Sequence, residues 1–273
     1  PGFYDVAMVV DNGVGTDSIY IEDYIEVLPT SQIPYFEGFE DYSTFNNNDF
    51  WTSESLTGGN AKFVVSGTSS LSGDNSAFLQ NFGQPDESLD ELISGPINLS
   101  VVQPSEDVTL SFRYAYRKRS ASNDEWLRVF ITQSCLDSWV QRKTIKGDIL
   151  SELTEPSFWT PDDANDWTTV HMTNITSTYF QEDFRVKFQF EADGGNNFLL
   201  DDINLYKGEP SDDIVLSVVD EGNLTNFNLF PNPADDALNI RFDEKTGGPI
   251  TIVITDVSGK QVLEQHIVSA KGD

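Results

Sequence analysis

The sequence predicts an all-β chain, and three observations support this. Short runs in which β-branched and aromatic residues alternate with polar ones recur along the 273 residues. Gly, Asn, Asp and Pro separate these runs, and no long amphipathic helical pattern occurs. This spacing is typical of β-sandwiches and jelly rolls. The clearest predicted strands cover residues 108–116, 126–132, 167–172, 184–191, 198–206 and 250–257.

The composition narrows the possible partners. With 45 acidic and 16 basic residues, the formal net charge is −29, which disfavours binding to the phosphate backbone of nucleic acid. The acidity is explained either by solubility or by carboxylates gathered around a divalent cation such as calcium. The single cysteine, Cys135, excludes a disulfide within the chain. No run approaches the roughly 20 apolar residues that span a bilayer.

Residues 1–28 read as strands joined by a turn at residues 11–15. The order Pro-Gly-x-Tyr-x-Val-x-x-x-Val-x-Asn-x-x-Gly resembles the C-terminal half of a polycystic-kidney-disease (PKD) type Ig-like domain. This resemblance implies that the front half of the domain lies upstream of Pro1. We therefore expect the sequence to be a fragment whose export signal, if one exists, also precedes it.

Residues 34–207 form the largest predicted unit. It opens with Phe-Glu-Gly-Phe-Glu at residues 36–40 and closes with the strand at residues 197–205. These two ends resemble the first and last strands of jelly-roll modules such as the MAM domain and several carbohydrate-binding families. The segments at residues 94–99 and 110–116 resemble strands that accompany secreted metallopeptidases of the pappalysin and cytophagalysin type. The resemblance implies a jelly-roll β-sandwich.

A linker is predicted at residues 208–223, because its Pro, Ser and acidic content suits an extended, solvated segment. Residues 224–273 carry the most specific motif. Phe230-Pro231-Asn232-Pro233 is followed by a strand that ends in Asp256-x-x-Gly259-Lys260. This pattern resembles the type A sorting domain of the Bacteroidota type IX secretion system, although the chain stops before the family's last segment and basic tail. The resemblance implies a small, truncated Ig-like β-sandwich.

The Pro-Asn-Pro loop has its own physical logic. Two prolines fix φ and remove two hydrogen-bond donors, while Asn accommodates a turn, so the loop is rigid before a partner arrives. By resemblance, an outer-membrane shuttle barrel at the type IX translocon recognises this domain, and the protein is then released or anchored at the cell surface. Its recognition residues would be Phe230, Pro231, Asn232, Pro233, Asp256, Gly259 and Lys260.

We expect no catalytic site in this chain. A zincin needs two histidines one helical turn apart with a glutamate between them, whereas His171 and His266 each stand alone on a predicted strand. No Gly-x-Ser-x-Gly elbow is present. Cys135 has no basic or histidine neighbour in sequence that would lower its pKa, so a nucleophilic role is disfavoured.

Calcium is the favoured site hypothesis. Alternation places Asp201 on the same face as Leu199 and Ile203, and burying a carboxylate is costly unless a cation or several donors compensate it. In a jelly roll the first strand would bring Glu40, and Glu37 with it, toward Asp201. By resemblance, the loop residue Asp74 is a further candidate ligand. The alternative is a set of hydrogen-bonded carboxylates without metal.

Five tryptophans suggest glycan binding, because indole faces stack on sugar rings. Trp51, Trp139 and Trp167 fall in strand patterns and are expected to pack in the core. Trp126 and Trp159 are the candidate glycan-binding residues, and Trp159 is the first to test for exposure.

Two functions remain open. The first is a type IX cargo whose jelly roll assists adhesion or substrate binding by a secreted enzyme, with a metallopeptidase expected upstream. The second is a carbohydrate-binding surface adhesin with no enzyme upstream.

Overall fold

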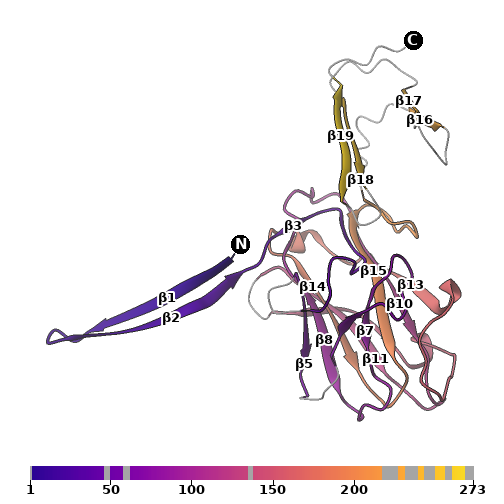
Figure 1. Cartoon of the computed structure of the whole chain (residues 1–273), viewed down its shortest axis with the longest axis horizontal. Coiled ribbons are helices and arrows are strands. Elements are labelled where there is room, and N and C mark those ends of the chain that lie inside the picture. Colours follow the sequence, from indigo (N-terminus) through magenta and orange to yellow (C-terminus); the bar gives the residue numbers. More distant parts are fainter. Residues whose placement is uncertain are drawn as a thin grey trace. The chain divides into compact units, whose positions relative to one another are not determined.

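A computed structural model describes residues 2–45, 50–57, 62–134, 138–216, 227–230, 239–242, 250–255 and 260–267. The chain divides into two compact units, Pro1–Val215 and Leu216–Asp273 (Figure 1). The described residues are almost entirely strands and loops, with three single-turn 3₁₀ helices: η1 (Gly147–Ile149), η2 (Ala164–Asp166) and η3 (Ser177–Tyr179). The predicted all-β class is confirmed. None of the helices in the described part is long and apolar enough to cross a membrane.

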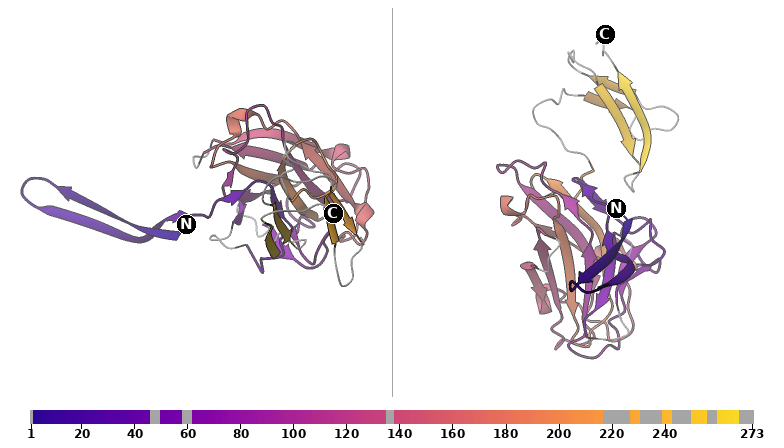
Figure 2. Two further views of the ribbon diagram at one scale, coloured as in Figure 1. Left: turned by 90° about the horizontal axis from the view of Figure 1, so that it is seen from above. Right: turned by 90° about the vertical axis from the view of Figure 1, so that its left-hand side faces the viewer.

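The larger unit contains a sandwich of two sheets, which Figures 1 and 2 show as facing layers. Neighbouring strands within both sheets are antiparallel. The six-stranded sheet has the order β13 (Trp167–Met172), β10 (Val108–Tyr116), β15 (Phe198–Lys207), β7 (Ser76–Leu79), β6 (Val64–Ser66), with β4 (Tyr35–Glu37) also paired to β15. The five-stranded sheet has the order β12 (Val140–Lys146), β11 (Trp126–Thr132), β14 (Arg185–Glu191), β8 (Leu89–Ser94), β5 (Trp51–Ser55). The unit also contains a short parallel pair, β3 (Ser31–Gln32) and β9 (Ile97–Asn98).

Aromatic side chains fill the space between the two sheets. Strand alternation turns Phe112 of β10 toward Phe188 of β14, and their ring centroids lie 5.0 Å apart at an interplanar angle of 75°. Phe190 and Phe198 lie 4.7 Å apart in the same core. Trp51 is fully buried, as expected, and its indole N–H donates to the Tyr35 hydroxyl at 2.8 Å.

The predicted alternation fails in β15, where Leu199 packs beside Ala115 and Trp159 on the outward face while Ile203 lies in the core. The bulge at Asp202 reverses the alternation, so Asp201 shares a face with Leu199 but not, as expected, with Ile203.

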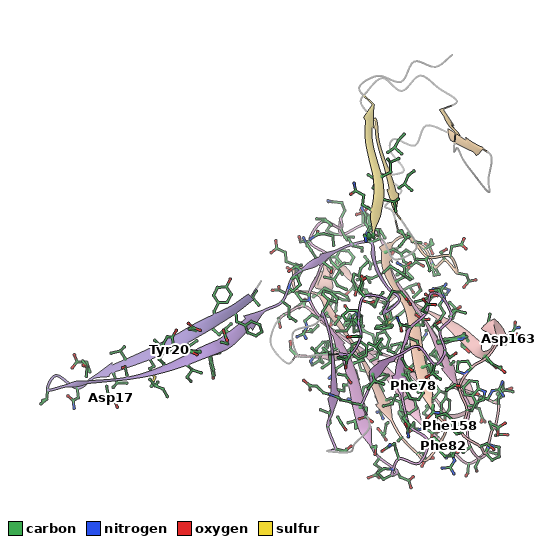
Figure 3. The ribbon with its side chains drawn as sticks, viewed as in Figure 1. Asp17, Tyr20, Phe78, Phe82, Phe158 and Asp163 are labelled. Atoms are coloured by element: carbon green, nitrogen blue, oxygen red, sulfur yellow. The ribbon has the colours of Figure 1, made fainter. Side chains whose placement is uncertain are left out.

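The first strands form a separate hairpin, β1 (Gly2–Asp11) and β2 (Thr16–Val27), in which Met8 faces Ile19. The carboxylate of Asp11 accepts from Gly13 N–H at 2.6 Å, and Gly13 has φ of +77°, a conformation that glycine tolerates. Large side chains are exposed on both faces of this hairpin, including Met8 at 57% and Tyr20 at 59% (Figure 3). The predicted strand–turn–strand order is confirmed, whereas the PKD assignment stays a prediction.

The predicted linker differs from the structure over residues 208–215, which we call the strap. Val215 N–H donates to the Asn204 side chain at 2.6 Å, and the same side chain donates back to Val215 C=O at 3.0 Å. Ser211 N–H donates to the Tyr206 hydroxyl at 2.7 Å. A composition that favours solvation does not reveal these partners on the outward face of the sheet. The strap therefore belongs to the larger unit.

The C-terminal unit contains two antiparallel pairs among its described residues. These are β16 (Phe227–Phe230) with β17 (Asn239–Phe242), and β18 (Ile250–Thr255) with β19 (Gln261–Ile267). The strand predicted at residues 250–257 corresponds to β18. Phe230 ends β16 and pairs with Asn239, and Lys260 directly precedes β19. The other predicted recognition residues, Pro231, Asn232, Pro233, Asp256 and Gly259, lie outside the described residues.

Candidate functional site

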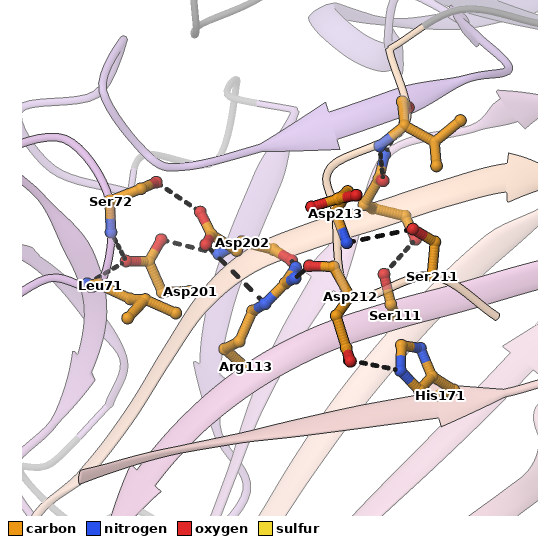
Figure 4. Close-up of polar contacts among 12 residues, drawn as sticks. Leu71, Ser72, Ser111, Arg113, His171, Asp201, Asp202, Ser211, Asp212 and Asp213 are labelled. Atoms are coloured by element: carbon orange, nitrogen blue, oxygen red, sulfur yellow. Dashed lines mark hydrogen bonds and ion pairs between the residues drawn. The ribbon is translucent and has the colours of Figure 1, made fainter. Parts of the chain in front are cut away.

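A groove of about 680 Å³ lies on the outward face of the six-stranded sheet. Alternation along β10 and β13 turns Arg113 and Thr169 away from the core, because their neighbours Phe112 and Val170 point inward. The strap closes one side through Asp212 and Asp213 (Figure 4). The other residues that line the groove are Leu71, Ser72, Ala164, Trp167, Asp202 and Ile214.

Arg113 is the central cation of this groove and is only 5% exposed. Its guanidinium donates to the backbone carbonyl of Asp212, and Nε lies 4.0 Å from the Asp202 carboxylate. Burial raises the pKa of Asp202, while a hydrogen bond from Ser72 and the charge of Arg113 oppose that shift. His171 Nε2 lies 3.1 Å from the exposed Asp212 carboxylate. Arg113 thus ties the strap to the sheet.

A backbone irregularity produces the Asp201–Asp202 pair. Asp202 has φ of +47°, and the register between β10 and β15 shifts between Ser111 and Arg113. This bulge lets the two consecutive carboxylates contact the same loop, since Leu71 N–H donates to Asp201 at 2.8 Å and the Ser72 hydroxyl donates to Asp202. The sequence signal for this arrangement is the Asp-Asp doublet that interrupts an apolar strand.

Two of the predicted calcium ligands hold opposite ends of the loop at residues 71–75. Asp201 also accepts from Asp202 N–H at 2.7 Å, and burial, followed by the negative charge of Asp202, raises its pKa to about 8. At the other end, Glu40 accepts from the backbone N–H groups of Asp74 and Asn75 at 3.0 and 2.9 Å. The structure thus brings Glu40 and Asp201 to one loop, to which Asp74 contributes a backbone donor.

Glu37 occupies a different environment. It accepts from the Tyr35 hydroxyl at 2.8 Å, Phe39 N–H at 2.7 Å and the Tyr42 hydroxyl at 3.3 Å. Burial raises the pKa of the Glu37 carboxyl to about 7, and these donors oppose the shift. Within the described ranges, no group of three or more His, Cys, Asp or Glu side chains is arranged to hold a metal ion. Of the predicted ligands, Glu37, Glu40 and Asp201 each accept hydrogen bonds from N–H or O–H donors.

The two candidate glycan-binding tryptophans differ in environment. Trp159 is only 9% exposed and packs against Phe78, Ala115 and Leu199, with the Arg117 guanidinium 4.6 Å from its ring centroid. An open platform at Trp159 therefore does not fit its burial. Trp126 is half-buried on the outward face of the five-stranded sheet. Trp139 and Trp167, expected in the core, are also half-buried.

Of the residues considered for catalysis, the structure describes the side chain of His171 alone. His171 lies on β13 and contacts the strap through Asp212. Cys135 and the side chain of His266 lie outside the described residues.

Comparison with known families identifies the end of the chain. Residues 228–273 match the family described as the secretion system C-terminal sorting domain. The protein carries a type IX sorting domain and is secreted or displayed at the cell surface. The expected sorting domain and localisation are thereby confirmed. No curated protein is significantly similar to the chain.

Several solved structures are distant neighbours. The K2 cleaved adhesin domain of Lys-gingipain is 14% identical, with a TM-score of 0.45, over 63% of this chain and 98% of that one. The K3 domain of the same protein, from Porphyromonas gingivalis W83, is 14% identical with a TM-score of 0.44, and the match covers 63% of this chain and 97% of that one. A structure of carbohydrate-binding modules from the β-sandwich superfamily is 16% identical with a TM-score of 0.41, and the match covers 77% of this chain and 75% of that one. At these scores the likeness does not extend to individual residues or ligands.

Proposed function

We propose that this chain is cargo of the type IX secretion system and that its C-terminal unit acts as the export signal. The match of residues 228–273 to the sorting-domain family carries this proposal. The jelly roll serves as the binding module, engaging a surface or a substrate on behalf of a larger secreted protein.

Recognition centres on the Phe230-Pro231-Asn232-Pro233 segment. The two prolines restrict the backbone before docking, so little conformational entropy is lost when the segment binds. Phe230 supplies an aromatic anchor, and Asp256, Gly259 and Lys260 are the other proposed recognition residues. The partner is an outer-membrane shuttle barrel at the translocon.

A reporter fusion tests this proposal. Residues 224–273 are fused to an unrelated periplasmic protein in a host with a working type IX system. The expected result is surface or extracellular reporter. Two matched controls are the same fusion with Pro231→Ala and Pro233→Ala, and the reporter without residues 224–273. Reporter that stays in the periplasm with the intact fusion contradicts the proposal.

The module upstream of the jelly roll extends the same proposal. The β1–β2 hairpin exposes large side chains on both faces, including Met8 and Tyr20, and an isolated two-stranded hairpin is marginally stable, which favours a PKD-like domain. The parent protein is then a secreted enzyme, with a metallopeptidase as the favoured class. A His-Glu-x-x-His segment upstream supports this version, whereas a parent gene that encodes no catalytic domain opposes it.

A carbohydrate-binding adhesin is the second candidate function. Trp126 favours it, because its indole lies on an outward sheet face beside the charged side chains of Arg128 and Lys146. Glycan-array binding that is lost on Trp126→Ala would support this function. Retained binding in that variant would oppose it.

Structural calcium is a further part of the proposal. Glu40 and Asp201 would hold the ion, with Glu37 and Asp74 as the other predicted ligands. The chemistry fits at Asp201, whose buried carboxyl favours the protonated form unless a positive charge compensates it. Calcium would neutralise this charge and stabilise the fold. Chelation by EDTA should then lower Tm, and an unchanged Tm contradicts calcium binding.

A further inference from the structure

The outward face of the five-stranded sheet carries a group of side chains that the export function does not use. In β11, Leu127, Val129 and Ile131 point into the core, so Trp126, Arg128 and Phe130 point outward. The register extends this face onto the adjacent strands, where Trp126 lies opposite Lys146 and Phe130 lies opposite Lys187.

Two tryptophans on this face each have two cations beside them. The Arg128 guanidinium lies 4.5 Å and the Lys146 ammonium 4.0 Å from the Trp126 ring centroid. The Lys187 ammonium lies 4.9 Å from the Trp139 ring centroid, and the Arg185 guanidinium lies 5.5 Å from it. We call these six residues the Trp–cation face.

Hydrogen bonds and ion pairs order the centre of this face. Lys187 Nζ lies 2.8 Å from the Glu91 carboxylate, which also accepts from Gln189 at 2.6 Å. Arg128 Nη1 lies 2.6 Å from Glu191. Because these contacts fix the long side chains in advance, a ligand would lose less conformational entropy in binding to them.

The charge of the face contrasts with that of the whole chain. Four of the chain's 16 Lys and Arg residues stand beside these two indoles, and three of them pair with Glu91, Glu191 and Asp124, so these seven groups sum to +1 whereas the whole chain carries −29. Lys146 keeps 45% of its side chain exposed, and the exposed Asp124 carboxylate lies 3.8 Å away. An incoming carboxylate can displace so exposed a pair at little cost. The positive groups therefore match an anionic ligand.

The register also sets the reach of that ligand. Lys146 lies opposite Trp126, and Arg185 lies opposite Thr132. These rows are six residues apart along β11, or roughly 20 Å at the rise of an antiparallel strand. A compact monosaccharide cannot contact both ends, whereas an extended polymer can.

We propose that the Trp–cation face binds an extended polysaccharide whose sugar rings carry carboxylate groups. Its carboxylates pair with Lys146 and Arg185, and its rings pack against Trp126 and Trp139. This inference rests on the proposed role of the jelly roll as a binding module and adds the ligand's charge class to it.

Calorimetric titration of the full chain with polygalacturonate, and in parallel with neutral xylan and galactan, tests the inference. Polygalacturonate should bind preferentially, and its affinity should fall several-fold when salt rises from about 0.05 to about 0.3 M because the ion pairs are exposed. Lys146→Gln and Trp139→Ala should each weaken binding roughly tenfold, in line with the loss of one contact worth about 1.4 kcal/mol.

Lys207→Gln is the matched control, because Lys207 lies on the other sheet and pairs with Glu106 at 3.1 Å. It should leave affinity unchanged. Lys146→Gln alters an exposed side chain, so it keeps the test valid if Trp139→Ala unfolds the protein. Equal or tighter binding of xylan or galactan overturns the inference, as does the absence of polygalacturonate binding. Binding of neutral xylan or galactan alone would overturn this inference and leave the binding-module role standing, so the two failures are distinguishable.

Discussion

Substitution of Asp201 by Asn tests whether the buried carboxyl holds a proton in the folded protein. The pKa of Asp201 is raised from 3.8 to about 8, chiefly by burial and secondly by the charge of Asp202. Because the folded value lies above the unfolded one, this group's contribution to stability is complete below pH 3.8. It is then lost progressively as pH rises toward 8. The loss between pH 4 and pH 7 is on the order of 4 kcal/mol.

Asp201→Asn removes this titration while keeping one acceptor oxygen. One of the hydrogen bonds that Asp201 accepts from Leu71, Ser72 and Asp202 is lost, at a cost of about 1 kcal/mol. The variant should therefore be less stable than the wild type at pH 4 and more stable at pH 7, with the two stability curves crossing at about pH 4.5.

The assay is urea unfolding of the full chain in EDTA at several pH values. Tryptophan fluorescence, to which the buried Trp51 contributes, monitors the unfolding. Other acidic groups titrate in both proteins, so the informative quantity is the difference between their unfolding free energies. Asp213→Asn, at an exposed strap carboxylate, is the matched control for the change from Asp to Asn. A wild-type-minus-Asp201→Asn difference that stays constant from pH 4 to pH 7 refutes the reasoning.

Three further predictions concern the same unit. Calcium should raise Tm in the wild type but not in Glu40→Gln, and equal shifts in both proteins would exclude Glu40 as a ligand. A jelly roll ending at Lys207 should be roughly 2–3 kcal/mol less stable than one ending at Val215, because it loses the hydrogen bonds between the strap and Asn204. Equal urea midpoints for the two proteins would show that the strap contributes nothing to stability. Trp159→Ala should cost about 3–5 kcal/mol because it empties a buried site, and a change below about 1 kcal/mol would contradict that packing.

Sequence reasoning succeeds where the information is local. The strand pattern at residues 108–116 predicts β10, and the jelly-roll resemblance, which places the first strand beside the last, brings Glu40 and Asp201 to one loop. The sorting motif is also local, because its prolines and strand spacing lie within about 35 residues of one another. These features depend on periodicity and backbone restriction, both of which are visible in a single sequence.

The features that sequence reasoning misses depend on contacts between distant segments. The strap is held by Arg113, about 100 residues upstream, so its composition alone suggests a free linker. Trp159 follows a Pro- and Ser-containing segment that reads as exposed, yet Asn196 and Asn197 hold its backbone against the sheet. The Trp–cation face depends on the register of three strands, which alternation within one strand cannot supply.

Removal of residues 224–273 from the protein, in its native host, tests the central claim most directly. Surface delivery is measured by protease accessibility in intact cells, with the periplasmic fraction measured alongside. The account predicts that the truncated protein accumulates folded in the periplasm and disappears from the surface. Undiminished surface delivery of the truncated protein would contradict it.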